Sequence, residues 1–218
     1  MTRVPSFSHM TTENAMTLDN ANAWLDREVA SRALTVLVFF RGSWCPFCQG
    51  YLREMNKGFA TAIRKHGGEL IAITSQSEGA AKQAHDDWGL GYPVHSDPAN
   101  VLARRFDVAI TPKAQTVLAD DPKEYPAGMA QPAVVALDRT GQVIFRWAID
   151  PNEMNLGGAT DRPLPHDILE VIEAELSGES KPLGGESRLD VGFLAEHYPE
   201  QHAAFQAWVA SLEPTSSR

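Results

Sequence analysis

The chain has 218 residues, 43% hydrophobic and 22% charged, which suffices for one well-cored domain with an extension and argues against wholesale disorder. A net charge of −9 without a dense basic stripe argues against nucleic acid or an anionic membrane as the main partner. Residues 1–19 form a polar segment without the apolar core of a secretory signal, and no apolar run is long enough to span a bilayer. We therefore expect a cytoplasmic protein.

Predicted helices and strands alternate from residue 20 onward. A helix over Asn20–Ser31 precedes a strand over the largely apolar run Leu34–Phe40. The next helical pattern runs from Pro46 to Lys65, and Gly58 is expected to weaken or bend it. The later elements are the strand Glu69–Thr74, the helix Ser77–Trp88, the short strand Tyr92–His95, a helix Pro98–Phe106 capped by Asp97, a hairpin of Ala133–Leu137 and Gln142–Trp147, and the helix Pro165–Leu176.

This alternation predicts an α/β fold with a central mixed sheet covered on both faces. We expect one domain over residues 20–176, a linker over 177–190 and a C-terminal helical extension over 191–218. The extension is too short for its own core, so it should pack on the main domain or on a second subunit, as in a homodimer. A long loop over residues 113–130 is either a functional lid or a mobile excursion.

The only two cysteines, Cys45 and Cys48, stand two residues apart between the strand Leu34–Phe40 and the next helix. A helix that begins at the pair directs N–H groups and its positive dipole end at a thiolate, which lowers the thiol pKa. Buried structural cysteines, or a zinc site completed by His197 and His202, are the alternatives. The spacing at a strand-to-helix junction favours a reversible dithiol, with no metal or flavin cofactor.

Three segments carry a resemblance to a known family: residues 38–48 around the Cys-Pro-Phe-Cys motif, residues 95–98 before a helix, and residues 132–142 in the hairpin. Over roughly residues 20–176 the chain resembles the thioredoxin superfamily. It resembles more closely the peroxiredoxin-like branch, the alkyl hydroperoxide reductase/thiol-specific antioxidant group. The resemblance implies a thioredoxin-like three-layer fold and thiol-dependent redox activity.

The resemblance also implies roles for individual residues. Cys45 would be the attacking thiolate, Cys48 the resolving thiol, and Pro132 a cis-proline that faces them. Base rates for any single proline favour an ordinary trans peptide bond at Pro132.

The chain departs from the family pattern at three positions. Typical peroxiredoxins carry Pro-x-x-x-Thr/Ser-x-x-Cys, and with Cys48 as the peroxidatic cysteine, Arg41 replaces the proline and Cys45 replaces the hydroxyl residue. Phe39 stands where thioredoxins usually place a buried acid. The second thiol favours dithiol exchange over specialised peroxide reduction.

Further residues are candidates for substrate binding or thiolate tuning. Arg41 can stabilise a thiolate or bind an anionic substrate group, or it is a surface arginine. Trp44 shapes a surface for a partner or serves as packing. Arg162, in the loop over residues 155–163, can meet an anionic ligand, although a solvated loop arginine is the favoured interpretation.

We therefore expect a thiol–disulfide oxidoreductase in which Cys45 attacks and Cys48 resolves. An external thiol or disulfide donor, thioredoxin-like or glutathione, would complete the cycle with a peroxide or disulfide substrate. A thiol-dependent peroxidase that passes through a cysteine sulfenic acid is the alternative enzyme. A non-catalytic thioredoxin-like binding module is the alternative outside catalysis.

Overall fold

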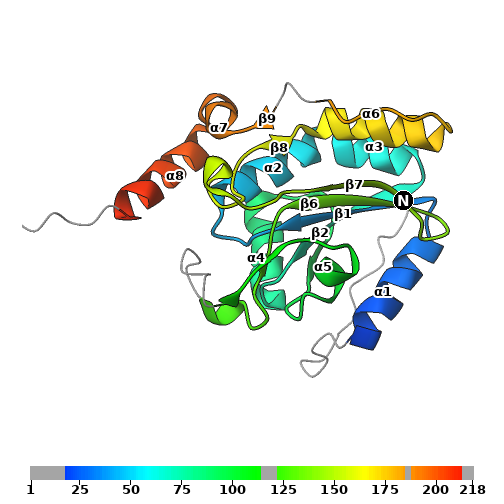
Figure 1. The fold of residues 1–218 in the computed structure, drawn as a ribbon, viewed down its shortest axis with the longest axis horizontal. Helices are drawn as coiled ribbons and strands as arrows, with labels where there is room; N and C mark the ends of the chain where they lie inside the picture. The colour runs from blue at the N-terminus through cyan, green and yellow to red at the C-terminus, as the bar shows by residue number, and fades with distance from the viewer. Residues whose placement is uncertain (1–17, 114–121, 185–187, 213–218) are drawn as a thin grey trace, which may run out of the picture.

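A five-stranded mixed sheet lies at the centre of the computed structural model, which describes residues 18–113, 122–184 and 188–212 (Figure 1). β1 pairs in parallel with β2 and antiparallel with β6, while β3 and β7 form the two edges. The predicted mixed sheet is confirmed. In the order of the sheet, the strands are β3 (Val94–Ser96), β2 (Gly68–Thr74), β1 (Leu34–Phe40), β6 (Ala133–Asp138) and β7 (Val143–Ala148).

Helices cover both faces of this sheet (Figure 1). Every residue of β1 is buried, and alternate side chains enter two separate cores. Val36 and Val38 pack on the side of α2, α3 and α6, whereas Leu37 and Phe39 pack on the side of α1 and α5. The three-layer arrangement follows from this alternation. The helices here are α1 (Leu18–Ala30), α2 (Pro46–Lys57), α3 (Phe59–Lys65), α4 (Glu78–Trp88), which runs along β3, α5 (Val101–Arg105) and α6 (Pro165–Leu176).

Local sequence signals determine where two of these helices begin and end. Gly58 separates α2 from α3, so the helix predicted over residues 46–65 is broken at the glycine. The Asp97 carboxylate accepts hydrogen bonds from three backbone N–H groups at the start of α5, at 2.8 to 3.3 Å, which confirms the predicted cap. The helix begins three residues later than predicted because Asn100 is in the left-handed region, with a φ of 54°.

Two short antiparallel ladders were not predicted. β4 (Ile110–Thr111) pairs with β5 (Met129–Ala130), and β8 (Arg162–Pro163) pairs with β9 (Arg188–Leu189). Two-residue strands carry no period that a sequence pattern can reveal. β9 lies within residues 177–190, so the segment predicted as a linker is tied to the main fold. Of the long loop predicted over 113–130, residues 114–121 lie outside the described residues, as do residues 1–17 of the predicted N-terminal segment.

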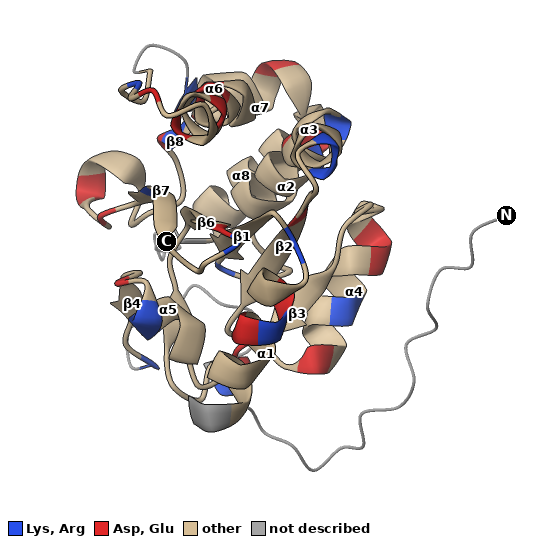
Figure 2. Cartoon of the chain, turned by 90° about the vertical axis from the view of Figure 1, so that its right-hand side faces the viewer, with Lys and Arg blue, Asp and Glu red and all other residues tan. Residues whose placement is uncertain are grey.

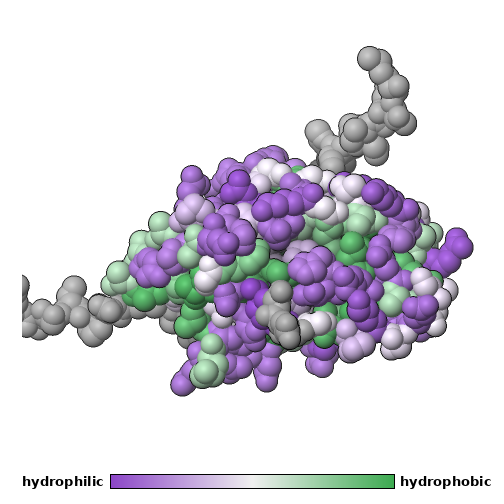
Figure 3. Space-filling model, turned by 90° about the horizontal axis from the view of Figure 1, so that it is seen from above, coloured by the Kyte–Doolittle hydropathy of each residue, from purple (hydrophilic) through white to green (hydrophobic). Residues whose placement is uncertain are grey.

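The described residues end with two further helices, α7 (Val191–His197) and α8 (Pro199–Leu212), which Tyr198 separates. α8 packs against α2 (Figure 1). Figure 3 shows apolar residues among polar ones on the end of the molecule that carries α8. Figure 2 shows both acidic and basic residues distributed over the surface helices. Among the described helices, none combines the length and the apolar character that crossing a membrane requires.

Candidate active site

The N-terminus of α2 positions both cysteines. Cys45 is the N-cap residue, and its Sγ accepts a hydrogen bond from the backbone N–H of Cys48 at 3.4 Å. Pro46 follows in the first turn, where its missing N–H costs no helical hydrogen bond. Both cysteines are free thiols, and their residues are 1% and 0% exposed. The helix thus brings two buried sulfurs together beside its positive dipole end.

Arg162 lies against Cys48, although 114 residues separate the two in the sequence. Its Nη2 donates to the Cys48 Sγ at 3.4 Å, and its remaining donors reach the carbonyl oxygens of Ala159 and Phe47. The guanidinium also lies 5.3 Å from the centroid of the Tyr51 ring. Arg162 is 0% exposed, so the interpretation as a solvated loop arginine is wrong. The planar guanidinium of Arg162 presents several N–H donors, and buried acceptors satisfy them in the interior.

These contacts give the two thiols opposite acidities. Burial by itself raises the pKa of Cys48, but the hydrogen bond from Cys45 and the positive charges of Arg162 and Arg41 outweigh it and hold that pKa well below its ordinary value. Burial, together with the hydrogen bond and charge of Cys48, raises the pKa of Cys45 well above its ordinary value. The contacts therefore favour ionisation of Cys48 over Cys45, which is the thiol that the resemblance implied would attack.

Arg41 contributes to the site through its backbone and its charge. Its backbone N–H donates to the Cys48 Sγ at 3.4 Å. Its guanidinium lies 5.0 Å from the centroid of the Trp44 ring, within range of a cation–π interaction. The residue is only 3% exposed, which excludes the alternative of a surface arginine.

Tyr125 holds the turn before the cysteines, and no sequence pattern pointed to it. Its hydroxyl donates to the Arg41 carbonyl oxygen at 2.9 Å and accepts from the Trp44 Nε1 at 2.7 Å. Burial raises the pKa of Tyr125, so the hydroxyl keeps its proton at neutral pH. The tyrosine comes from the described part of the loop predicted over 113–130, which supports the turn from outside the motif.

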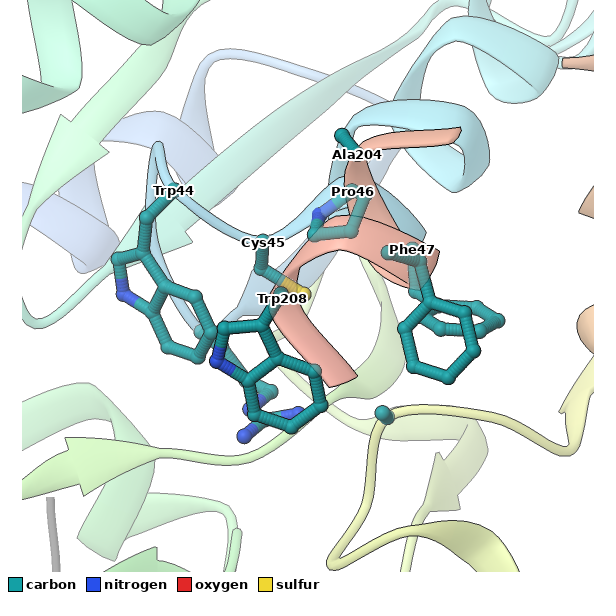
Figure 4. A pocket seen from close by; sticks show the side chains of 9 residues that line it. Trp44, Cys45, Pro46, Phe47, Ala204 and Trp208 are labelled. Atoms are coloured by element: carbon teal, nitrogen blue, oxygen red, sulfur yellow. The ribbon is translucent and has the colours of Figure 1, made fainter. Parts of the chain in front are cut away.

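An apolar pocket of about 200 Å³ opens beside Cys45. In Figure 4 the rings of Trp44, Trp208 and Phe47 lie around the Cys45 side chain. α8 supplies one wall, and its Phe205 ring meets the Phe47 ring edge to face at 4.9 Å between centroids. The C-terminal extension therefore helps to enclose the redox pair. The lining residues are Arg41, Trp44, Cys45, Pro46, Phe47, Ala159, Ala204, Phe205 and Trp208, and Cys48 is not among them.

Pro132 comes directly before β6. It lies near the end of β1 that leads to the cysteines, since Ala133 lies opposite Phe39. No peptide bond among the described residues is cis, so the implied cis-proline is wrong. The carbonyl oxygen of Pro132 continues the ladder by accepting from the backbone N–H of Ile149 at 3.0 Å, which suits an ordinary extended entry into the strand.

His197 and His202 lie on α7 and α8 and contact residues of their own helices. Within the described residues, no group of three or more His, Cys, Asp or Glu side chains is arranged to hold a metal ion.

The Tyr125 contacts leave no room for a side chain at Gly42. A Cβ there would collide with the Tyr125 hydroxyl and lie 2.8 Å from the Gln76 Oε1. Gly42→Ala should therefore lower the free energy of unfolding by about 1–3 kcal/mol, measured by urea denaturation. Gly79→Ala is the control, because a Cβ at that position of α4 meets only one atom, at 3.9 Å, and should add about 0.5–1 kcal/mol. Equal effects of the two substitutions would contradict the packing argument.

Comparison with known proteins shows a similar fold. Among solved structures, a cysteine-to-serine mutant of PrxQ from Xylella fastidiosa shares the fold, with a TM-score of 0.50 and 15% identity over 67% of this chain and 80% of that one. Reduced 2-Cys peroxiredoxin from Plasmodium vivax has a TM-score of 0.49 and 18% identity over 71% and 83% of the two chains. AhpC from Enterococcus faecalis has a TM-score of 0.47 and 20% identity over 76% and 78%. No curated protein matches the sequence.

The sequence model of the AhpC/TSA family matches residues 3–146, which is about two thirds of the chain. That range includes β1, both cysteines and Pro132 but ends before Arg162 and α8. The resemblance to peroxiredoxin-like proteins is confirmed: the chain belongs to the AhpC/TSA family and is a thiol-dependent oxidoreductase.

Proposed function

We propose that this chain is a peroxidase in which the Cys48 thiolate attacks the peroxide and Cys45 resolves the product. The observation that carries the proposal is the contact of Arg162 Nη2 with the buried Cys48 Sγ, at 3.4 Å. A charge-assisted hydrogen bond of this kind stabilises the thiolate, which is the nucleophilic form of cysteine. The role of Cys48 also agrees with the family position that the sequence assigns to a peroxidatic cysteine.

In the first step, the Cys48 sulfur forms a bond to the terminal oxygen of a hydroperoxide as the O–O bond breaks. The remaining oxygen takes a proton and leaves as an alcohol or as water, and Cys48 becomes a sulfenic acid. In the second step, the Cys45 sulfur forms the S–S bond, the S–O bond breaks and water leaves. The two cysteine sulfurs have then lost two electrons, and the two peroxide oxygens have gained them. Two external thiols return two electrons to the cysteines by exchange with the disulfide.

The position of the two sulfurs favours a peroxide over a disulfide as the oxidising substrate. Cys45 lines the pocket but holds its proton, whereas Cys48 carries the thiolate behind it. Cys48 is 0% exposed and does not line the pocket, so a small peroxide group suits this site better than a protein disulfide, which presents a much larger body.

Thiol–disulfide exchange that begins at Cys45 is the second candidate, because Cys45 is the sulfur that lines the pocket. Its raised pKa weighs against attack, since a protonated thiol is a poor nucleophile. For either reaction we propose a thioredoxin-like protein or glutathione as the external thiol donor and the cytoplasm as the location, on the sequence arguments given above.

The test is the reaction of the reduced protein with hydrogen peroxide, followed by stopped-flow tryptophan fluorescence. At pH 7 ionisation alone should make Cys48 up to roughly 30-fold faster than a free cysteine, which is only a few per cent ionised at that pH. The lowered pKa predicts that the rate holds as the pH falls below the ordinary thiol value and drops only as the pH passes through the depressed pKa of Cys48. A rate like that of free cysteine at every pH would refute the proposal.

A further inference from the structure

The Arg41 guanidinium is a buried cation for which the described residues provide no carboxylate partner. Its Nε is buried without a hydrogen-bond partner. Among the described residues, no carboxylate lies within ion-pair distance of it. Its guanidinium lies 5.0 Å from the centroid of the Trp44 ring, which is not a hydrogen-bond acceptor of the ordinary kind. Because burying a charge without a partner is unfavourable, such a group is a candidate to bind an anion.

The Cys48 thiolate does not accept a hydrogen bond from the Arg41 side chain. Arg162 already donates a side-chain hydrogen bond to the Cys48 Sγ, whereas Arg41 gives that sulfur only its backbone N–H. The charges of two buried guanidinium groups therefore act on one thiol pair. One positive charge remains uncompensated by the described residues, and it belongs to the arginine that lines the pocket.

The rest of the pocket fits an apolar body. Apart from Arg41 and the Cys45 thiol, its described lining consists of apolar or aromatic side chains from the start of α2, Ala159 and α8. A planar guanidinium matches a carboxylate in shape and charge and can donate two parallel hydrogen bonds to it. A volume of about 200 Å³ accommodates a group the size of a substituted benzene ring.

We propose that this pocket selects hydroperoxides that carry a carboxylate on an apolar body. Arg41 binds the carboxylate, the rings of Trp44, Phe47 and Trp208 hold the apolar part, and the peroxide group reaches Cys48 past Cys45. The inference rests on the proposed peroxidase function and names its substrate class, and the chemical steps are those given above.

The first experiment measures binding without catalysis. Calorimetry on the reduced protein compares 4-isopropylbenzoate with 4-isopropylbenzamide, which has the same shape but no charge. We expect the carboxylate to bind roughly tenfold or more tightly than the amide. Arg41→Gln should abolish this preference, and Arg53→Gln, which removes the same charge from α2 outside the pocket, should keep it. Equal binding of the two ligands, or a preference that survives in Arg41→Gln, would overturn the inference even if the protein is a peroxidase.

The second experiment measures selectivity in turnover. The ratio of kcat/KM for the para-carboxylate of cumene hydroperoxide to that for cumene hydroperoxide should exceed about 10 and fall close to 1 in Arg41→Gln. The ratio is the readout because loss of the Arg41 charge also raises the pKa of Cys48 and slows both substrates together. Should Arg41→Gln fail to fold, Arg41→Lys keeps the charge without the fork and should reduce the ratio.

These two experiments separate the two proposals. Absence of turnover with every peroxide, alongside a carboxylate preference in binding, would refute the peroxidase and leave the Arg41 site standing. Turnover with a ratio near 1 in the native protein would refute the Arg41 site and leave the peroxidase.

Discussion

Cys48→Ser is expected to lower the rate of reaction with hydrogen peroxide by at least about a thousandfold, because it removes the nucleophile itself. Serine at this position keeps the size of the side chain but ionises far outside the physiological range. The rate is measured by stopped-flow fluorescence with peroxide in excess.

Cys45→Ser is the matched variant and should behave differently. Its hydroxyl can still donate a hydrogen bond to the Cys48 thiolate, so the first reaction with peroxide should stay within about tenfold of the native rate. Turnover should stop after one equivalent, since no thiol resolves the sulfenic acid, which a dimedone adduct on Cys48 detects by mass spectrometry. The reverse pattern, in which Cys48→Ser reacts rapidly with peroxide and Cys45→Ser does not react, would show that Cys45 is the attacking sulfur.

Arg162→Met should slow peroxide reduction at pH 7 by about 10- to 100-fold, the usual effect of losing a hydrogen bond to a charged group. The substitution removes the guanidinium that helps to hold the pKa of Cys48 down, so that pKa rises. The pH dependence of iodoacetamide alkylation, in the Cys45→Ser background, measures it directly.

The direction of the pH effect distinguishes this role from a structural one. If Arg162 acts through the thiolate, raising the pH should restore much of the lost rate, because alkali then supplies the ionisation that the arginine provided. A variant that melts like the native protein but whose Cys48 keeps its low pKa would contradict the assignment. Arg162→Lys retains the charge and should lie between the two.

Local patterns in the sequence were sufficient for the sheet and for the position of the cysteines. The apolar run Leu34–Phe40 is a strand with the predicted bounds, and Pro165–Leu176 is a helix with the predicted bounds. The apolar run marks the strand and Pro165 marks the first turn of the helix, so each signal lies within the element itself. Gly58 likewise breaks its helix as its conformational freedom suggests.

The composition of the site was less predictable, because it depends on contacts between distant parts of the chain. Tyr125 and Arg162 reach the motif across 81 and 114 residues, respectively, and neither stands in a pattern that marks it as buried. The assignment of the thiolate to Cys48 depends on which sulfur those side chains touch. With the peroxiredoxin motif aligned on Cys48, the sequence also allows the proposed assignment, whereas the resemblance implied Cys45 as the attacking thiolate.

The pair of buried arginines has a consequence for the reduction potential. On the proposed assignment, the reduced pair carries a negative charge on Cys48 that lies beside Arg162 and is attracted by Arg41. Closing the disulfide removes this charge and leaves two guanidinium groups buried without it. The site therefore stabilises the reduced form over the oxidised form, which makes the disulfide a stronger oxidant. External thiols readily reduce such a disulfide, and the reduced pair is a weak reductant of other disulfides.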